Sequence, residues 1–320
     1  MGNHHKLLAA GAAAAAGGGT AVLAAARKLY QVGFATGAAE RGKPALPEQG
    51  SCYSPFRAVM KADFDALCAA PAEQVSILNR EGLRLAGRYY HTADGAPLVL
   101  FFHGWRGRAE RDGCGGFRLC RDYGCNLLLV DQRGHGASEG ACLTMGVKER
   151  DDCADWANWA AARWPGTPLF VMGVSMGAAT VLMSADRGLP AAVAGLVADC
   201  GYTSPRDILR KCLPETVPGL PLEVCYRLGR LGARAYGGFD PEAADARKAL
   251  AHCKVPVLFF HGADDDFVPC FMSRQNYAAC ASPRRLVVVP GAPHGVSCYV
   301  DPERYRRELY DFMNRCLGRE

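Results

Sequence analysis

The chain has 320 residues, of which 49% are hydrophobic and 22% are charged, and its formal net charge is +5. This composition is typical of an ordinary globular protein, and it excludes a disordered chain, a fibrous repeat and a polytopic membrane protein. The small positive charge is not gathered into a basic run, so the sequence gives no sign of a nucleic-acid partner.

The first predicted element is an uncharged stretch at residues 7–26, built mainly of alanine and glycine. As a helix it would be about 30 Å long, the thickness of a bilayer core, so we predict a single membrane tether here. Two alternatives are a cleaved signal peptide, with a site at Ala24-Ala25-Ala26, and a soluble low-complexity tail. More basic residues follow the stretch than precede it, which favours a cytoplasmic position for the rest of the chain.

Residues 37–57 are rich in glycine and proline and are predicted to be a linker. We therefore divide the chain into a hydrophobic N-terminal segment with its linker, residues 1–57, and one domain over residues 58–320. An amphipathic pattern predicts a helix over 59–67. Two strands, at 74–78 and 83–90, are expected around a turn.

Six short apolar runs predict further strands, at 98–102, 126–130, 169–172, 193–198, 257–260 and 286–289. Because they do not alternate between apolar and polar residues, they are expected to be buried on both faces, as in a parallel sheet. Helical segments are predicted at 107–121, 147–163, 176–187, 271–281 and 302–317. This order predicts a doubly wound α/β sheet of about eight mostly parallel strands, with helices on both faces.

The interval between the runs at 193–198 and 257–260 is too long for a simple crossover. It contains several prolines and two helical pieces, at 207–212 and 222–235. We interpret residues from about 200 to 250 as a small helical cap over the carboxyl edge of the sheet. The alternative is a decorated crossover that does not contact substrate.

The cysteines number 15 and are spread along the chain, and no two are spaced C-x-x-C. This excludes a zinc ribbon and a thioredoxin-like redox motif. We expect most of them to be small buried residues in a reducing compartment, which agrees with a cytoplasmic position.

A G-x-S-x-G motif at residues 173–177 follows an apolar strand and precedes a helix-forming run. In this context the serine lies on a sharp, strained turn, and the two glycines let the strand and the helix approach closely. The motif therefore predicts Ser175 as a nucleophile above the sheet.

A serine hydroxyl needs a base to remove its proton, and the chain has 8 histidines. His103, His135 and His261 each lie in a turn directly after a strand, where a structural role explains them. His294 lies in the loop after the last strand, from which it can return to the edge where Ser175 lies. We expect His294 to be the base.

The base in turn needs an acid that fixes its orientation and stabilises the imidazolium. The loop after the penultimate strand offers Asp264, Asp265 and Asp266, and Asp199 ends the strand before it. Each choice gives the chain order Ser, Asp, His. The pattern of residues alone leaves the four open.

Together these motifs resemble those of the α/β-hydrolase superfamily, over about residues 72–317. The resemblance is carried by His103-Gly104-Trp105, the D-x-R-G-x-G-x-S segment at 131–138, the G-x-S-x-G motif, the loop at 261–269 and Pro293-His294-Gly295. Within the superfamily the chain is most similar to serine aminopeptidase-like and prolyl-oligopeptidase-like esterases, including bacterial members with an N-terminal hydrophobic segment.

The resemblance implies a complete α/β-hydrolase site. In this superfamily the loop H-G-x-x-D-x-x-V-P carries the acid at its fifth residue, which is Asp265 here. The implied catalytic residues are thus Ser175, Asp265 and His294. The backbone N–H groups of Trp105 and Met176 are the implied oxyanion hole.

The expected activity is cleavage of a carboxylic ester or related acyl bond in a small-molecule or short-peptide substrate, through an acyl-enzyme. The same residues would serve a peptidase, a thioesterase or an acyltransferase, and an inactive hydrolase fold used for binding is the non-enzyme alternative. No cofactor and no metal are implied. The glycine-rich segment at 113–116 lacks the Lys-Ser/Thr of a P-loop and is interpreted as a loop.

Overall fold

The computed structural model describes residues 19–42, 46 and 51–319. Its centre is one eight-stranded sheet in the order β1-β2-β4-β3-β5-β6-β7-β8. The strands are β1 (Glu73–Leu78), β2 (Arg84–Tyr90), β3 (Leu98–Phe102), β4 (Asn126–Val130), β5 (Leu169–Val174), β6 (Val193–Asp199), β7 (Val257–Gly262) and β8 (Arg284–Val289). Strand β2 runs antiparallel to β1 and β4, and the other neighbouring pairs are parallel. The predicted α/β sheet is confirmed.

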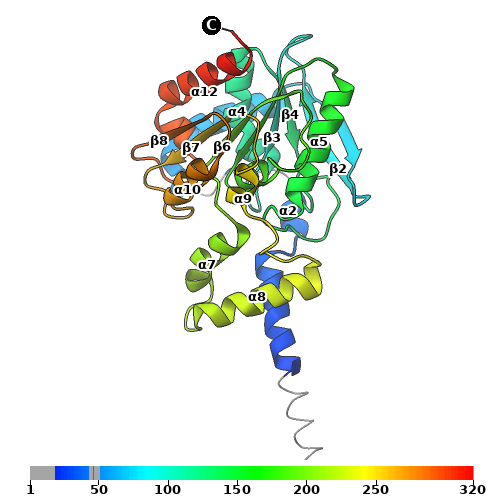
Figure 1. Cartoon of the computed structure of the whole chain (residues 1–320), viewed down its shortest axis with the longest axis vertical. Coiled ribbons are helices and arrows are strands. Elements are labelled where there is room, and N and C mark those ends of the chain that lie inside the picture. The colour runs from blue at the N-terminus through cyan, green and yellow to red at the C-terminus, as the bar shows by residue number, and fades with distance from the viewer. Residues whose placement is uncertain (1–18, 43–45, 47–50, 320) are drawn as a thin grey trace, which may run out of the picture.

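Helices cover both faces of the sheet (Figure 1). One face packs against α5 (Glu149–Arg163), α6 (Met176–Met183), α9 (Ala246–Leu250) and α10 (Phe271–Ala279). The other face packs against α3 (Arg57–Ala69), α4 (Ala109–Tyr123) and α12 (Pro302–Cys316). Every residue of β3, β4 and β7 is buried, as expected for runs that are apolar on both faces.

The segment at 113–116 is the inner face of α4, so its interpretation as a loop is wrong. A Cβ on Gly113 would lie 2.8 Å from Leu129 Cδ2, and one on Gly116 would lie 3.8 Å from the Phe101 ring. Gly113 therefore lets α4 approach the sheet closely, whereas a Cβ on Gly116 would make only an ordinary contact. Tertiary packing here outweighs the low helix propensity of glycine.

Before α9, the long interval between β6 and β7 contains two further helices, α7 (Pro205–Thr216) and α8 (Leu222–Gly237), at the positions of the two predicted helical pieces. They stand away from the sheet as a small helical cap (Figure 1). Helix α7 begins at Ser204, whose side chain accepts a hydrogen bond from the Asp207 N–H, a common helix cap.

Residues 19–33 are helical and pack against α8 (Figure 1). The two helices touch where Ala26 meets Gly232: Ala26 is fully buried, and a Cβ on Gly232 would lie 2.2 Å from the Ala26 carbonyl oxygen. Phe34, just after the helix, packs edge to face on Phe239 with ring centroids 5.2 Å apart.

This packing bears on the predicted tether at 7–26. Residues 7–18 lie outside the described residues, and 19–26 belong to the helix that contacts α8. Among the helices in the described part of the chain, none is long and apolar enough to cross a membrane. The division at residue 57 stays a prediction, although Phe34 and Glu40 on its N-terminal side are buried against the rest of the protein.

All 15 cysteines lie in the described part of the chain and are free thiols. Cys52 and Cys68 are exposed, whereas the others are buried or partly buried. Most of them thus behave as small apolar residues, as the sequence predicts.

Candidate active site

Ser175 occupies the sharp turn between β5 and α6, with φ at 56°. A Cβ on Gly173 would lie 2.4 Å from the backbone of Gly177, and a Cβ on Gly177 would lie 2.0 Å from the Phe102 carbonyl oxygen. Only glycine fits at either position, because strand, turn and helix cross there without room for a side chain. The motif thus holds the serine in a left-handed conformation that most residues avoid.

Ser175, His294 and Asp265 form one hydrogen-bonded chain. The Ser175 Oγ lies 2.9 Å from His294 Nε2, and His294 Nδ1 lies 2.7 Å from Asp265 Oδ2. The three side chains come from the loops after β5, β7 and β8, which end at the same edge of the sheet. With a carboxylate at Nδ1, the imidazole carries its proton there, so Nε2 is free to accept the serine proton.

The Asp265 carboxylate is fixed by its own loop. Its Oδ1 accepts hydrogen bonds from the backbone N–H groups of Phe267 (3.1 Å) and Val268 (2.8 Å). Burial disfavours the charged form, but hydrogen bonds with His261 and His294 outweigh it and hold the pKa of Asp265 at about 2. Asp265 is therefore ionised at neutral pH.

The other three candidate acids do not pair with His294 in this way. Asp264 and Asp266 are exposed. Asp199 is buried at the end of β6, where burial raises its pKa to about 6, and its Oδ1 has no hydrogen-bond partner. Of the four, Asp265 is the one whose carboxylate the structure brings to the His294 ring.

His103 and His261 have the structural roles that the sequence suggests. Both are fully buried. His103 Nε2 accepts from the Gln132 N–H at 3.1 Å, and burial lowers the pKa of His103 to about 4, so its ring is neutral. His261 joins Ser273 and Val268 through its two ring nitrogens, at 2.7 Å each.

The residues implied for an oxyanion hole flank the serine. Met176 is the first residue of α6. Trp105 follows Gly104, where a Cβ would lie 3.4 Å from the Ser175 Cβ, so this loop runs directly past the serine. The role of the two N–H groups rests on the resemblance and is taken up below.

Sequence reasoning missed two side chains that fix this loop. Asp112 Oδ2 accepts the Gly104 N–H at 2.8 Å, and its Oδ1 lies 2.6 Å from Arg111 Nε. Arg106 reaches the other way, to the Glu40 carboxylate and, at 3.0 Å each, to the carbonyl oxygens of Val32 and Ala35. These acidic and basic residues look in the sequence like an ordinary solvated surface, so no local signal marks them.

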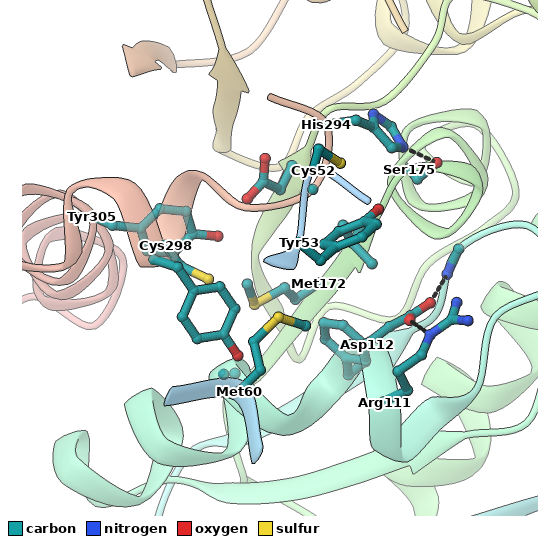
Figure 2. A pocket seen from close by; sticks show the side chains of 18 of the residues that line it. Cys52, Tyr53, Met60, Arg111, Asp112, Met172, Ser175, His294, Cys298 and Tyr305 are labelled. Carbon is teal, nitrogen blue, oxygen red and sulfur yellow. Dashed lines mark hydrogen bonds and ion pairs between the residues drawn. The ribbon is translucent and has the colours of Figure 1, made fainter. Parts of the chain in front are cut away.

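Two cavities open at Ser175. The first, here called the His294 cavity, has a volume of about 390 Å³ and includes His294, Asp112, Asp199 and Tyr53 in its lining. Figure 2 shows the hydrogen-bonded pairs Ser175–His294 and Arg111–Asp112 among the side chains of this cavity. The second, here called the cap cavity, measures about 230 Å³ and lies between α7, α8 and the helix at 19–33.

Cys200, Asp265 and His294 also offer ligand atoms that lie within 4.8 Å of one another. Two of these groups already satisfy each other through the Asp265–His294 hydrogen bond, which a metal ion would have to break. The arrangement suits proton transfer from Ser175 better than metal binding.

The chain is similar in sequence to several known proteins. The family model of serine aminopeptidase, S33, matches residues 95–222. An uncharacterized protein of Mycobacterium tuberculosis is 30% identical over 252 residues, which cover 76% of this chain and 78% of the relative. The uncharacterized protein YqkD of Bacillus subtilis is 26% identical, with 61% of this chain and 64% of that protein covered.

Solved structures show the same fold. The esterase Pf2001 of Pyrococcus furiosus superposes with a TM-score of 0.64 at 21% identity, covering 86% of this chain and 98% of that one. Est1E of Butyrivibrio proteoclasticus, solved with ferulic acid, gives a TM-score of 0.58 at 18% identity, covering 77% and 100%. The chain belongs to the α/β-hydrolase superfamily, and it is a hydrolytic enzyme.

One further relative is a lipase. The lysophosphatidylserine lipase ABHD12 of Danio rerio is 27% identical over 205 residues. The match covers 59% of this chain but only 49% of that protein, so the chain spans about half the length of this relative.

Proposed function

We propose that this protein is a serine esterase that works through Ser175, His294 and Asp265 and an acyl-enzyme intermediate. The observation that carries the proposal is the continuous hydrogen-bonded chain from the Ser175 Oγ through both ring nitrogens of His294 to the Asp265 carboxylate. Esterases and lipases among the similar proteins support an ester as the substrate class.

In the first half of the reaction, Ser175 Oγ attacks the ester carbonyl while its proton passes to His294 Nε2. The ionised Asp265 stabilises the imidazolium that forms. The N–H groups of Trp105 and Met176 bind the tetrahedral oxyanion, a contribution of roughly 3 kcal/mol for one such donor in other enzymes. His294 then gives its proton to the leaving alcohol oxygen, the ester C–O bond breaks, and the acyl group remains on Ser175.

In the second half, water takes the place of the alcohol. His294 accepts a proton from the water as its oxygen attacks the acyl carbon, and the same N–H groups bind the second oxyanion. The proton returns to Ser175 Oγ as the acyl-enzyme bond breaks, which releases the carboxylic acid and restores the starting state.

The test uses the full chain and its Ser175→Ala variant. We expect the wild type to hydrolyse p-nitrophenyl esters and to react with a fluorophosphonate probe, and the variant to lose both. Labelling that persists in Ser175→Ala would contradict the assignment of the nucleophile. A wild type that neither reacts nor hydrolyses would instead favour a fold used for binding.

The match to a serine aminopeptidase model makes a peptidase the second candidate. An aminoacyl p-nitroanilide and an acyl thioester, assayed beside the p-nitrophenyl esters, separate peptidase and thioesterase activity from ester cleavage. We expect the ester to give the highest kcat/KM. A higher value for the anilide would replace the esterase assignment with a peptidase.

Attachment to a membrane through the stretch predicted at 7–26 remains part of the proposal, but its last residue, Ala26, is buried against Gly232 of α8 and does not belong to the attached part. It is supported by the absence of charge in this stretch and by the basic residues that flank it. Cell fractionation tests it: the protein should sediment with membranes and resist extraction with high salt. Recovery in the soluble fraction would contradict the tether.

A further inference from the structure

The two cavities differ in how they contact the reacting groups. Ser175, Trp105 and Phe267 line both of them, so the cavities meet at the nucleophile. His294 lines the first cavity but not the second. An ester bound at Ser175 would therefore have one arm beside the histidine and the other arm away from it.

The requirement for proton transfer determines which half of the ester lies in which cavity. His294 Nε2 must protonate the leaving oxygen within hydrogen-bond distance, so the alcohol half of the ester belongs on the His294 side. The acyl half stays bonded to Ser175 and must extend elsewhere. The cap cavity is the space that opens at Ser175 without contacting His294.

The linings of the two cavities agree with this division. The His294 cavity is also largely apolar, with Phe101, Leu119 and Met172 in its lining, but it adds ionisable and hydroxyl groups, among them Asp112, Asp199 and Tyr299. The cap cavity is lined mainly by apolar side chains: Leu29, Val32, Phe34, Met145, Ile208, Leu209, Leu213 and Val268. Aliphatic carbon is favoured in the second cavity, whereas a polar alcohol can find partners in the first.

We propose that the cap cavity is the acyl-binding site, and that the enzyme acts on esters of a medium-length aliphatic acid with a polar alcohol. This inference rests on the proposed function. An apolar cavity of about 150 Å³ holds the six carbons of benzene, so a volume of about 230 Å³ holds an acyl chain of roughly nine carbons by the same ratio.

The N-terminal helix is one wall of this site. Leu29, Val32 and Gly33 belong to the helix at 19–33, which lies outside the residues 95–222 that the serine aminopeptidase model matches. The indole Nε1 of Trp105 donates to the Gly33 carbonyl oxygen at 3.4 Å, so the helix also contacts the loop beside Ser175. The length of acyl chain accepted by Ser175 is thus set in part by the N-terminal helix.

On the wall of the cap cavity opposite the helix 19–33, Gly229 of α8 leaves space because it has no side chain. The buried face of α8 consists of Cys225, Tyr226, Gly232 and Ala233, and Gly229 falls in the middle of that face at helical spacing. A Cβ there would nevertheless meet no heavy atom within 4 Å, whereas one on Gly232 would collide with Ala26. The space in front of Gly229 is the cavity itself.

Gly229 therefore gives a sharp test, because a side chain at this position fills the cavity without moving the backbone. We measure kcat/KM for p-nitrophenyl octanoate and acetate in the full-length wild type and in Gly229→Leu. Each methylene kept out of an apolar site costs about fourfold in binding. The ratio of octanoate to acetate should therefore fall at least about tenfold. Ala235→Leu, which adds a similar side chain at an exposed position of the same helix, should keep the wild-type ratio.

Leu29→Ala tests the same cavity from the other wall and does not depend on the folding of Gly229→Leu. It enlarges the cavity, so the ratio of decanoate to octanoate should rise about fourfold or more. The exposed Gln31→Ala on the same helix should leave this ratio unchanged.

The outcomes separate the inference from the proposed function. If the variants react with the fluorophosphonate probe but keep the wild-type chain-length profile, the acyl assignment is wrong and the esterase stands. If the wild type neither hydrolyses any ester nor reacts with the probe, the proposed function fails, and the acyl site fails with it.

Discussion

Which of the neighbouring aspartates pairs with His294 depends on the direction in which each side chain points. Asp264, Asp265 and Asp266 share one loop, yet only Asp265 is turned inward, where two backbone N–H groups and His294 hold it. A sequence pattern cannot show this direction, because it depends on the turn that the loop adopts after β7. The resemblance to the H-G-x-x-D-x-x-V-P loop of the superfamily implies the same residue, Asp265.

Asp265→Asn should lower kcat about 1,000- to 10,000-fold, because an amide cannot stabilise the imidazolium and favours the wrong histidine tautomer. Initial rates with p-nitrophenyl acetate measure the effect. Asp264→Asn, the same exchange at an exposed neighbour, is the control and should lose less than about twofold. Equal losses in the two variants would argue against Asp265 as the acid.

Asp199 should make stability depend on pH. Its pKa in the folded protein, about 6, lies above the ordinary value of 3.8. Below about pH 4 the Asp199 carboxyl is protonated in the folded protein and does not lower its stability. Above about pH 6 the buried carboxyl is ionised, and the full destabilisation appears. Asp199→Asn, which stays neutral, should raise the free energy of unfolding at pH 7.5 by up to roughly 3 kcal/mol, and this gain should vanish near pH 4.

Urea denaturation of Asp199→Asn and wild type at the two pH values measures this difference. The exposed Asp94→Asn controls for the loss of one negative charge. A gain of the same size at both pH values would contradict the assignment of the cost to a buried ionised carboxylate.

Among the structural elements, the loop after β3 depends most on its neighbours. Trp105 and Arg106 lie in it, and Arg106 adopts a positive φ of 46°. The guanidinium holds this conformation through its contacts with Glu40 and with the carbonyl oxygens of Val32 and Ala35. A segment far upstream thus positions the loop that is proposed to supply an oxyanion donor.

Arg106→Ala should lower kcat about tenfold while KM for a short ester changes by less than about twofold. Complete removal of an oxyanion donor costs about 100- to 1,000-fold, and a loosened donor should lose less. Arg106→Lys should recover part of the loss through Glu40. Arg80→Ala, which removes an ion pair of α5 with the β1–β2 turn, is the control and should keep kcat. A rise in KM alone would show that Arg106 affects binding and not the oxyanion.

The strands and the nucleophile turn could be predicted because their signals are local, whereas His294 is predicted from its place in the loop after the last strand. Buried parallel strands are continuous apolar runs, and the turn at Ser175 needs glycine at two fixed positions. The helix 19–33 against α8 could not be predicted, because an alanine- and glycine-rich stretch carries no pattern that identifies a partner 200 residues further on. Its fit depends on Gly232, which in the sequence looks like any other helix glycine.

In the molecule as a whole, the described residues 19–42 are therefore part of the hydrolase body. Phe34 is 2% exposed and belongs to the same core cluster as the strands β3 and β5. In the sequence, Phe34 lies between the predicted tether at 7–26 and the predicted linker at 37–57, within the division 1–57. Its burial indicates that this segment folds together with the sheet.

Phe34→Ala should lower the free energy of unfolding by about 3 kcal/mol, the usual cost of emptying a buried aromatic site. Urea denaturation followed by circular dichroism measures it. Val22→Ala, at a site that is 45% exposed on the helix 19–33 that precedes Phe34, should change stability by less than about 0.5 kcal/mol. An unchanged midpoint for Phe34→Ala would mean that the N-terminal segment does not fold with the sheet.

The backbone conformation of Ser175 lowers the stability of the protein, although the proposed activity needs a serine at this position. A non-glycine residue at a positive φ costs on the order of 1–3 kcal/mol, and glycine at the same position avoids that cost. Random mutagenesis that selects only for heat resistance would therefore favour glycine at 175 and yield a more stable, inactive protein. The proposed nucleophile therefore lowers the stability of the fold by an amount that glycine at 175 would restore.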